Sequence, residues 1–232
     1  MCPDTTIFFT HIPKTSGTSF KETLLNPNIP DSANFKYRDK RQWLTDISSC
    51  KIVTGHFKFG LHNFFRRKPR YITFLREPLD RAVSHYYFIK DCDPKKYLHP
   101  LRNIADSLSL EDFYSQNMRL QNLQTNYIAG YFASEMHNRF PWLFSSKMLL
   151  EFACLNLRRY YIAYGLQERF EDSIQHFMSI LDWKKRYHVE PKKSTKNRPS
   201  VSDLDTHVKR SLKQTHELDI IFYKYACENF PM

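Results

Sequence analysis

The sequence predicts an α/β fold in which a central parallel β-sheet is flanked by helices. Short runs rich in β-branched and aromatic residues alternate with longer stretches of helical periodicity, which is typical of this class. The chain has 232 residues, of which 41% are apolar, so it is long enough to bury one substantial core. We therefore expect a single domain over residues 1–232.

The elements of this fold follow from local patterns. Strands are predicted at Thr6–Thr10, Lys51–His56, Tyr71–Leu75 and Tyr160–Tyr164. Helices are predicted at Thr18–Leu25, Leu79–Ile89, Leu110–Gln116, Leu120–Ala129, Lys147–Leu157, Glu168–Leu181 and Asp203–Glu228. Ser200 and Ser202 precede the last helix, and their hydroxyl groups suit the positive end of a helix.

The charge of the chain favours anionic partners. Lys and Arg number 35 against 24 Asp and Glu, a net charge of +11. Nucleotides, acidic glycans, nucleic acids and anionic membranes would all suit this charge. A basic nucleic-acid-binding module is therefore one alternative, but no RNP-like strand, helix-turn-helix or zinc-finger spacing supports it. We predict no nucleic-acid partner.

Cysteine usage and hydropathy bear on the location. The five cysteines are scattered, without a CxxC pair or metal-like spacing to histidine, which suits a reducing compartment. No apolar run approaches the roughly 18 residues needed to span a bilayer. We expect a soluble cytoplasmic protein, unless the chain is a trimmed form, and no bound metal.

The first chemical motif is the stretch FFTHIPKTSGTSF, in which a predicted strand runs through a polar loop into a helix. Such a turn offers free backbone N–H groups and the positive end of a helix, which together favour an anion. Lys14 adds a charge and Gly17 permits close approach of the backbone. Hydroxyl donors are supplied by Thr15, Ser16, Thr18 and Ser19. An ordinary capped turn would use similar residues, so the loop alone does not decide.

The second motif is YITFLREPLDRAVSHYYF. A buried strand delivers Arg76 at its carboxyl end, Pro78 begins a helix, and Ser84 follows about two turns later. Ligands of parallel α/β sheets bind at the carboxyl ends of the strands. We therefore expect Lys14 and Arg76 to face one crevice, each suited to one end of a doubly anionic nucleotide.

Together these motifs resemble those of sulfotransferases that use 3′-phosphoadenosine 5′-phosphosulfate (PAPS), in the form shared by Golgi carbohydrate sulfotransferases and their bacterial relatives. The stretches TGHFKFGL, NLQTNYIAG, YGLQERFEDSI and STKNRPSVSDL are similar to further family segments and occur in the family's order. The resemblance implies the P-loop-like nucleotide-binding fold of sulfotransferases. The ATP-type P-loop order GxxxxGK[ST] is absent, which disfavours a nucleotide kinase.

The resemblance also implies roles for individual residues. The loop Lys14–Ser19 would hold the 5′-phosphosulfate, with Lys14 at the bridging oxygen, and Arg76 and Ser84 would bind the 3′-phosphate. A basic loop at residues 190–200 would close over the nucleotide. Its candidate contacts are Lys193, Lys196 and Arg198, although a solvated basic loop remains an equal interpretation.

His56 is the predicted general base for the acceptor hydroxyl, because it ends a predicted strand at the same rim and imidazole titrates near neutrality. The Gly55-His56 pair is similar to the Gly-His context of a histidine in glycan 2-O-sulfotransferases. His11 and His62 are alternatives, while His85 is expected to pack.

Two remaining segments carry expectations of their own. Glu77 and Asp80 flank Arg76 and are expected to form helix ion pairs. Residues 91–117 form a polar segment that is the least similar to the family, and acceptor specificity tends to lie in such segments. Its candidate contacts to an acidic sugar are Lys95, Lys96, Tyr97, His99 and Arg102, with a solvated surface as the alternative.

The sequence thus predicts an enzyme that moves a sulfuryl group from PAPS to an acceptor hydroxyl, leaving adenosine 3′,5′-bisphosphate (PAP). A carbohydrate acceptor is favoured, while a protein tyrosine or a small-molecule hydroxyl remains open. The Golgi lumen would be the location only if an N-terminal anchor had been lost. The sequence does not specify the oligomeric state.

Overall fold

The structure, a computed structural model, describes residues 6–38, 42, 45–93, 98–188 and 198–231. Within these residues five parallel strands form one sheet in the order β2-β3-β1-β4-β5. The strands are β1 (Ile7–Thr10), β2 (Asn34–Lys36), β3 (Ile52–Gly55), β4 (Tyr71–Leu75) and β5 (Tyr161–Leu166). The predicted parallel sheet is confirmed. The sequence missed β2, because a three-residue edge strand shows no detectable periodicity.

Helices occupy most of the remaining described chain. They are α1 (Gly17–Phe20), α2 (Asn26–Asn28), α3 (Leu61–Phe64), α4 (Pro78–Asp91), α5 (Arg102–Ser107), α6 (Leu110–Gln116), α7 (Leu123–Arg139), α8 (Ser146–Tyr160), α9 (Phe170–Leu181), α10 (Thr206–Thr215) and α11 (Glu217–Glu228). A π-helical segment, Lys21–Leu25, joins α1 to α2. The helices predicted near α4, α6, α8 and α9 are confirmed to within a few residues.

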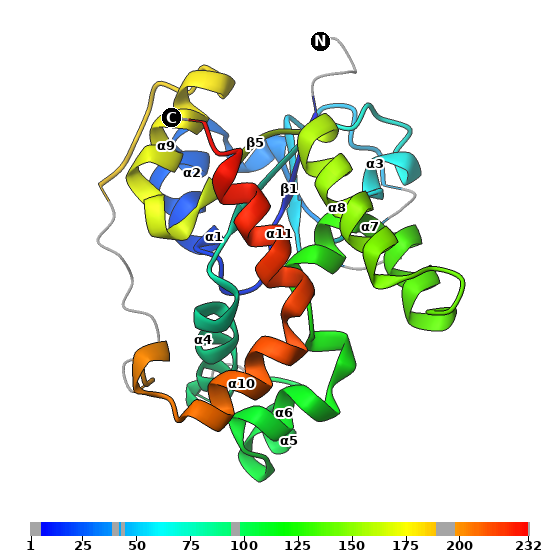
Figure 1. Ribbon diagram of the computed structural model, residues 1–232. Coiled ribbons are helices and arrows are strands. Elements are labelled where there is room, and N and C mark those ends of the chain that lie inside the picture. Colours follow the sequence, from blue (N-terminus) through cyan, green and yellow to red (C-terminus); the bar gives the residue numbers. More distant parts are fainter. Residues whose placement is uncertain (1–5, 39–41, 43–44, 94–97, 189–197, 232) are drawn as a thin grey trace.

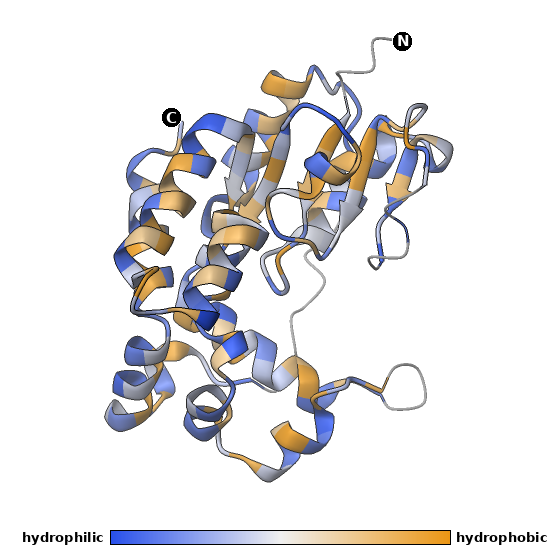
Figure 2. Ribbon diagram, turned by 90° about the vertical axis from the view of Figure 1, so that its right-hand side faces the viewer, coloured by the Kyte–Doolittle hydropathy of each residue, from blue (hydrophilic) through white to orange (hydrophobic). Residues whose placement is uncertain are grey.

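The helices form two layers on the sheet and a third group beside it (Figure 1). Phe8 and Phe9 of β1 point to opposite faces, as alternation along a strand requires. One face packs against α7, α8 and α11, and the other against α1 and α9. Helices α4, α5, α6 and α10 bury a separate cluster, which includes Phe113 and Leu212. Figure 2 shows apolar residues concentrated along the strands, with hydrophilic residues on outward helix surfaces.

The last predicted helix is wrong as a single element, because it is split into α10 and α11 at His216. His216 has φ −123° and ψ 24°, is fully buried and packs edge-on against Tyr114 at a centroid distance of 4.7 Å. The two halves meet different neighbours: α10 packs on α4 and α6, whereas α11 packs on α7 and α8. Tertiary packing therefore overrides a continuous helical pattern.

Part of the polar segment 91–117 is buried in the structure. Helices α5 and α6 lie within it, and Ala105, Leu110, Phe113 and Tyr114 are buried. The alternative of a solvated surface concerned only the candidate contacts in the first half, whereas the second half, with the predicted helix Leu110–Gln116, contributes to the core. Lys95, Lys96 and Tyr97 lie outside the described residues.

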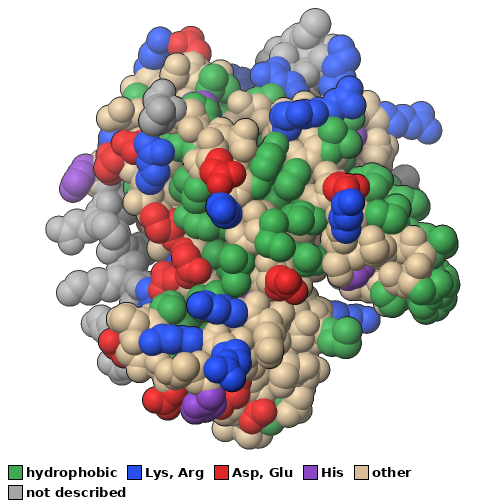
Figure 3. Space-filling view, in the orientation of Figure 1, with side chains coloured by type: hydrophobic (Ala, Val, Ile, Leu, Met, Phe, Trp, Pro, Cys, Tyr) green, Lys and Arg blue, Asp and Glu red, His purple; other side chains and the backbone are tan. Residues whose placement is uncertain are grey.

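Exposed apolar side chains gather where α7 turns into α8. The most exposed of them are Phe132, Trp142 and Leu143. Figure 3 shows hydrophobic side chains clustered over this region, and elsewhere on the same face Lys and Arg lie among Asp and Glu. The positive charge is therefore interspersed with negative charge on this face.

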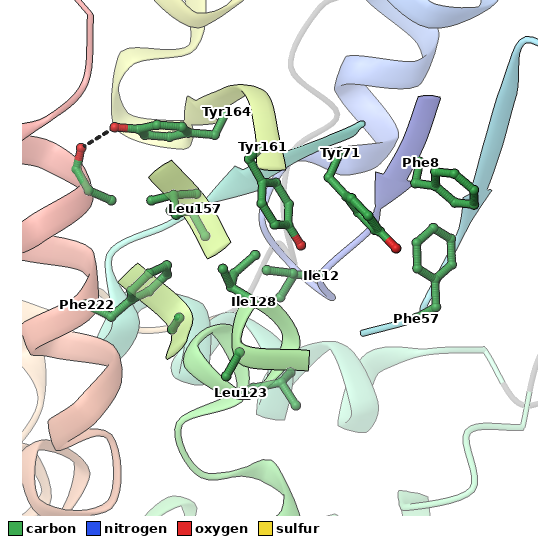
Figure 4. Packing of buried hydrophobic residues seen from close by; sticks show 14 of the residues in the cluster. Phe8, Ile12, Phe57, Tyr71, Leu123, Ile128, Leu157, Tyr161, Tyr164 and Phe222 are labelled. Carbon is green, nitrogen blue, oxygen red and sulfur yellow. Dashed lines mark hydrogen bonds between the residues drawn. The ribbon is translucent and has the colours of Figure 1, made fainter. Parts of the chain in front are cut away.

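The main core joins one face of the sheet to α7. Figure 4 shows Tyr161 near Ile128 of α7 and beside Tyr71, with Phe8 next to Tyr71 and Phe57 on the far side of the cluster. Helix α7 is longer than predicted and kinks at Gly130, where φ is +99°. A β-carbon there would lie 2.8 Å from the Phe59 carbonyl oxygen, so glycine lets the loop after β3 enter the kink.

Candidate functional site

The loop between β1 and α1 has a backbone suited to an anion. Lys14 and Ser16 have left-handed φ values of 67° and 65°, which non-glycine residues adopt at a cost of about 1–3 kcal/mol each. Alternating left- and right-handed residues turn successive N–H groups toward a common concave side. The Thr15 hydroxyl donates to the Ile12 carbonyl at 2.9 Å and so holds the loop from within. The predicted strand–loop–helix junction is therefore present, and its conformation is an unusual one.

Gly17 is required for a reason that the sequence did not indicate. A β-carbon on Gly17 would lie 2.1 Å from Cδ2 of His11, so the His11 imidazole fills the space that a side chain would take. His11 also stacks on Phe9, with a centroid distance of 5.6 Å. Burial, His56 and Lys21 lower the pKa of His11 to about 2, so it is neutral at physiological pH. His11 is a structural part of the loop.

Arg76 joins the two motifs. It follows the last residue of β4, is 3% exposed, and donates from Nη1 to the Lys14 carbonyl at 3.0 Å. Its Nε donates to Oδ2 of Asp80 at 2.8 Å, which is the helix ion pair expected for Asp80. The Glu77 side chain instead accepts the Asp80 N–H at the N-terminus of α4, so its predicted ion pair is replaced by a helix cap.

Three cations from three segments meet here. Asp80 also pairs with Arg198, the first described residue after the gap at residues 189–197. Burial, Arg76 and Arg198 lower the pKa of the Lys14 ammonium to about 8. Lys193 and Lys196, the other predicted contacts of the basic loop, lie outside the described residues. Lys14, Arg76 and Arg198, called the cationic cluster below, repel one another and so favour an added anion.

Two details of this region concern the individual predictions. Ser84 is fully buried on α4, and its hydroxyl has no hydrogen-bond partner among the described residues. The Lys14 ammonium lies 4.3 Å from the centroid of Phe88, one turn beyond Ser84. The sequence assigned Lys14 and Arg76 to opposite ends of a nucleotide. In this structure the Lys14 side chain instead lies over α4, on the Arg76 side.

His56 lies just beyond β3 with one ring nitrogen fixed. Its Nδ1 is 2.6 Å from the His11 carbonyl oxygen, and the two imidazoles stack at 4.6 Å. A carbonyl can only accept, so Nδ1 carries the hydrogen and Nε2 keeps its lone pair in the neutral ring. His56 is exposed as a residue, and desolvation of its ring by the surrounding protein lowers the pKa of His56 below its usual value. The ring is therefore a neutral proton acceptor at physiological pH.

The other candidate histidines have structural partners. His62 is buried, and its Nδ1 lies 2.9 Å from the Tyr71 hydroxyl. His85 is buried with Nδ1 3.3 Å from the Tyr114 hydroxyl, which confirms that it packs. His56 is thus the candidate that combines an exposed position with an available lone pair.

Two cavities flank the helix that follows the loop. The α9-side cavity has a volume of about 440 Å³, and its lining includes Ser16, Ser19, Thr23, Gln167, Phe170 and Arg186. The β2-side cavity has a volume of about 380 Å³, and its lining includes Thr18, Lys21, Glu22, Asp31, Lys36 and Thr54. The predicted hydroxyls therefore diverge: Ser16 and Ser19 face one cavity and Thr18 faces the other.

Sequence reasoning missed Gln124, although it lies in the stretch NLQTNYIAG. Gln124 is fully buried on α7, and its side-chain amide hydrogen-bonds both the N–H and the carbonyl of Arg76. Its place in a stretch similar to a family segment indicates a functional residue. Its partner, Arg76, lies 48 residues away in the chain, so the sequence does not show the contact. Only the fold brings the two together.

Other expectations concern metals and membranes. In the part of the chain that the structure describes, no group of three or more His, Cys, Asp or Glu side chains is placed to hold a metal ion. No helix among those same residues has both the length and the apolar character needed to cross a membrane.

The parallel sheet, the cationic cluster and the exposed imidazole define an α/β protein with a candidate anion site at the carboxyl ends of its strands. A model of the sulfotransferase family matches residues 1–226, and the chain therefore belongs to that family. This confirms the predicted class of enzyme, a PAPS-dependent sulfotransferase.

The chain is similar to several known proteins. Heparan sulfate 2-O-sulfotransferase 1 from Pongo abelii and from Homo sapiens is 24% identical over 260 residues, which cover 98% of this chain and 71% of each relative. The crystal structure of mouse sulfotransferase SULT7A1 complexed with PAP matches with a TM-score of 0.41 and 11% identity. That match covers 95% of this chain and 66% of the other, slightly under two thirds.

Proposed function

We propose that this protein transfers the sulfuryl group of PAPS to a hydroxyl of an acidic carbohydrate, with His56 as the general base. The observation that carries the proposal is the joining of the two motifs by Arg76, which sets the cationic cluster at the same strand ends as the His56 imidazole. An anionic donor and a neutral base are what sulfuryl transfer to an alcohol requires.

The residues present fit a nucleotide that carries a 3′-phosphate. Phosphate oxygens accept hydrogen bonds, and the buried Ser84 hydroxyl is a donor without a partner among the described residues. Arg76, just before α4, offers a planar guanidinium, and burial together with neighbouring cations destabilises the charge of Lys14. The α9-side cavity, with its Phe170 ring, offers an apolar surface for the base of the nucleotide.

The chemistry divides between donor and protein. PAPS supplies an electrophilic sulfur and PAP as the leaving group. The acceptor oxygen forms a bond to sulfur while the bond from sulfur to the bridging phosphate oxygen breaks, and the hydroxyl proton moves to Nε2 of His56. The His11 carbonyl orients the imidazole by accepting its Nδ1–H. Stabilisation by Lys14 of the charge that develops on the leaving group stays a prediction, because in this structure its ammonium lies over Phe88 of α4.

The acceptor assignment rests on the relatives and on the β2-side cavity. The relatives named above are heparan sulfate 2-O-sulfotransferases, which act on an acidic carbohydrate. Lys21 lines the β2-side cavity, and its ammonium lies 5.8 Å from the Phe9 ring, which in turn stacks on His11 beside His56. Its charge suits a carboxylate or sulfate of the acceptor near the proposed base.

The segment 91–117 keeps only part of its predicted role in acceptor recognition. Arg102 is an unsuitable contact, because its guanidinium pairs with Asp106 at 2.7 Å and donates to the Cys92 carbonyl at 3.0 Å. Specificity from the rest of the segment stays a prediction.

A cytoplasmic location also stays a prediction. Cys50, Cys92, Cys154 and Cys227 are free thiols, in keeping with a reducing compartment.

The function is tested with ³⁵S-labelled PAPS and an unsulfated polymer of alternating uronic acid and hexosamine. We expect label to enter the polymer, and His56→Ala to lower turnover by about 10²–10⁴-fold because a positioned general base is lost. PAP affinity, measured by calorimetry, should be unchanged in this variant. His207→Ala, at an exposed histidine that faces Glu111, is the matched control. Absence of transfer to the polymer would contradict the acceptor class, and normal turnover in His56→Ala would make His56 structural.

A further inference from the structure

We propose that helix α11 positions Arg76 for nucleotide binding, through Gln124 on one side and Glu168 on the other. This inference rests on the proposed function, in which Arg76 binds the 3′-phosphate. Both Gln124 and Glu168 act as positioning residues, because their contacts are to the backbone of the Arg76–Glu77 turn.

The first connection is a two-point clamp on the Arg76 backbone. Oε1 of Gln124 accepts the Arg76 N–H at 2.9 Å, and Nε2 donates to the Arg76 carbonyl at 2.8 Å. Gln124 is fully buried, so no solvent competes for these bonds. A planar amide that bonds both groups of one residue fixes the orientation of that residue where β4 ends.

Gln124 is in turn fixed by α11. Oδ2 of Asp219 accepts the Gln124 N–H at 3.2 Å, and Oδ1 accepts both the N–H and the hydroxyl of Thr125, at 2.7 and 2.8 Å. The Asp219 N–H returns a bond to the Asn122 side chain at 3.1 Å. One fully buried carboxylate on α11 therefore holds the first turn of α7, from which the clamp projects.

The second connection reaches the next residue of the same turn. Oε1 of Glu168 accepts the Glu77 N–H at 2.8 Å, and its Oε2 accepts the hydroxyl of Tyr223. Tyr223 lies four residues after Asp219 on α11, so the two project from the same face of that helix. Consecutive residues of the β4–α4 turn are thus tied to one helix by two separate routes.

The positioning of Arg76 matters because its side chain is long and must meet a phosphate in a defined orientation. A guanidinium binds a phosphate selectively only when its planar group faces the phosphate oxygens. A fixed backbone lowers the conformational entropy that the Arg76 side chain loses on binding. Asp80 and the Lys14 carbonyl set the far end of the side chain, while Gln124 sets its origin. Residues far from any ligand contact should therefore control recognition of the 3′-phosphate.

The test compares the affinities for PAP and for adenosine 5′-monophosphate, which lacks the 3′-phosphate. Gln124→Met keeps the size of the side chain and removes both hydrogen bonds. It should reduce the preference for PAP by about tenfold, on the scale of losing one ordinary hydrogen bond. Tyr223→Phe removes only the hydroxyl that bonds Glu168 and should reduce the preference by a smaller factor.

Asn156→Leu is the matched control. Asn156 is also buried, and its side-chain amide donates to two carbonyls of α7, Ile128 at 2.9 Å and Ala129 at 3.0 Å, at the Gly130 kink. It should lower stability and leave the preference for PAP unchanged, which separates positioning from general destabilisation.

A wild-type preference for PAP that persists undiminished in Gln124→Met would overturn this inference and leave the proposed function standing. If Gln124→Met does not fold, an undiminished preference for PAP in Tyr223→Phe would likewise overturn this inference. A wild-type protein without preference for PAP would overturn the proposed function as well.

Discussion

The Lys14 ammonium lies close to two guanidinium groups, and this crowding changes its acidity. Burial, Arg76 and Arg198 lower its pKa to about 8, so the charge that the loop offers to an anion depends on pH within an accessible range. His56 differs, because desolvation lowers the pKa of its imidazole. The ring is therefore neutral at physiological pH. Protonation states at the site are therefore set by neighbouring residues.

The first prediction concerns the pH dependence of PAP binding. An anion favours the protonated form of Lys14, so affinity should be greatest below the pKa of about 8 in the free protein and should fall as pH rises through it. The slope should approach at most about tenfold per pH unit for one group. Calorimetry between about pH 6 and pH 10 measures it.

Lys14→Arg provides the comparison, because a guanidinium keeps its charge at higher pH. The variant should show a flatter alkaline limb. Equal slopes in the two proteins would mean that another group causes the dependence.

At the scale of elements, the loop before α1 and the loop after β3 are built together. The Gly17 backbone leaves space for His11, and the His11 carbonyl accepts from His56, so the anion loop and the proposed base share one residue. The strand pairing of β1 with β3 brings these loops to the same edge of the sheet. A change at Gly17 or His11 should therefore alter both PAP binding and catalysis.

The second prediction tests this shared packing. Gly17→Ala places a methyl group 2.1 Å from His11 Cδ2 and should destabilise the protein by about 1–3 kcal/mol, the usual effect of overpacking. Adding His11→Ala removes the ring that clashes, so the double variant should be less destabilised than the sum of the single variants. Denaturant unfolding of the three variants measures this coupling. Simple additivity would show that the loop relaxes away from the ring.

At the scale of the whole molecule, the sheet gathers distant segments at one edge. Arg76 at the end of β4 bonds the carbonyl of Lys14, 62 residues earlier, and Arg198 reaches Asp80 from 118 residues later. The net charge of +11 belongs to the whole chain, whereas the proposed anion site rests on three specific cations. Selectivity among nucleotides should therefore follow the positions of the phosphates more than their total charge.

The third prediction compares PAP with ATP, which carries more phosphates but none at the 3′ position. Thermal stabilisation should be clear with PAP and weak with ATP at the same free concentration. Arg76→Ala should weaken PAP binding by about 1.5–3 kcal/mol, the value of a hydrogen bond to a charged group. Equal shifts with PAP and ATP in the wild type would exclude the proposed 3′-phosphate site.

Prediction from sequence was most accurate where local pattern and packing agree. Buried strands such as β4 have continuous apolar runs, and their bounds were predicted directly. It failed at β2, which is too short to show periodicity, and at His216, where neighbouring helices divide a regular pattern. Within segment 91–117 only the helix Leu110–Gln116 was predicted, and α5 was not, because polar neighbours dominate the composition there.

The sequence by itself determined the fold class, the family motifs and the candidate residues Lys14, Arg76, Ser84 and His56. These follow from residue types at short spacings, and such information is local. Only the tertiary structure decided that His11 fills the space beside Gly17, that Asp80 bridges two arginines, and that Gln124 clamps the Arg76 backbone. Each of these contacts joins positions that sequence spacing does not relate, because the sheet and its helices must first form before the partners meet.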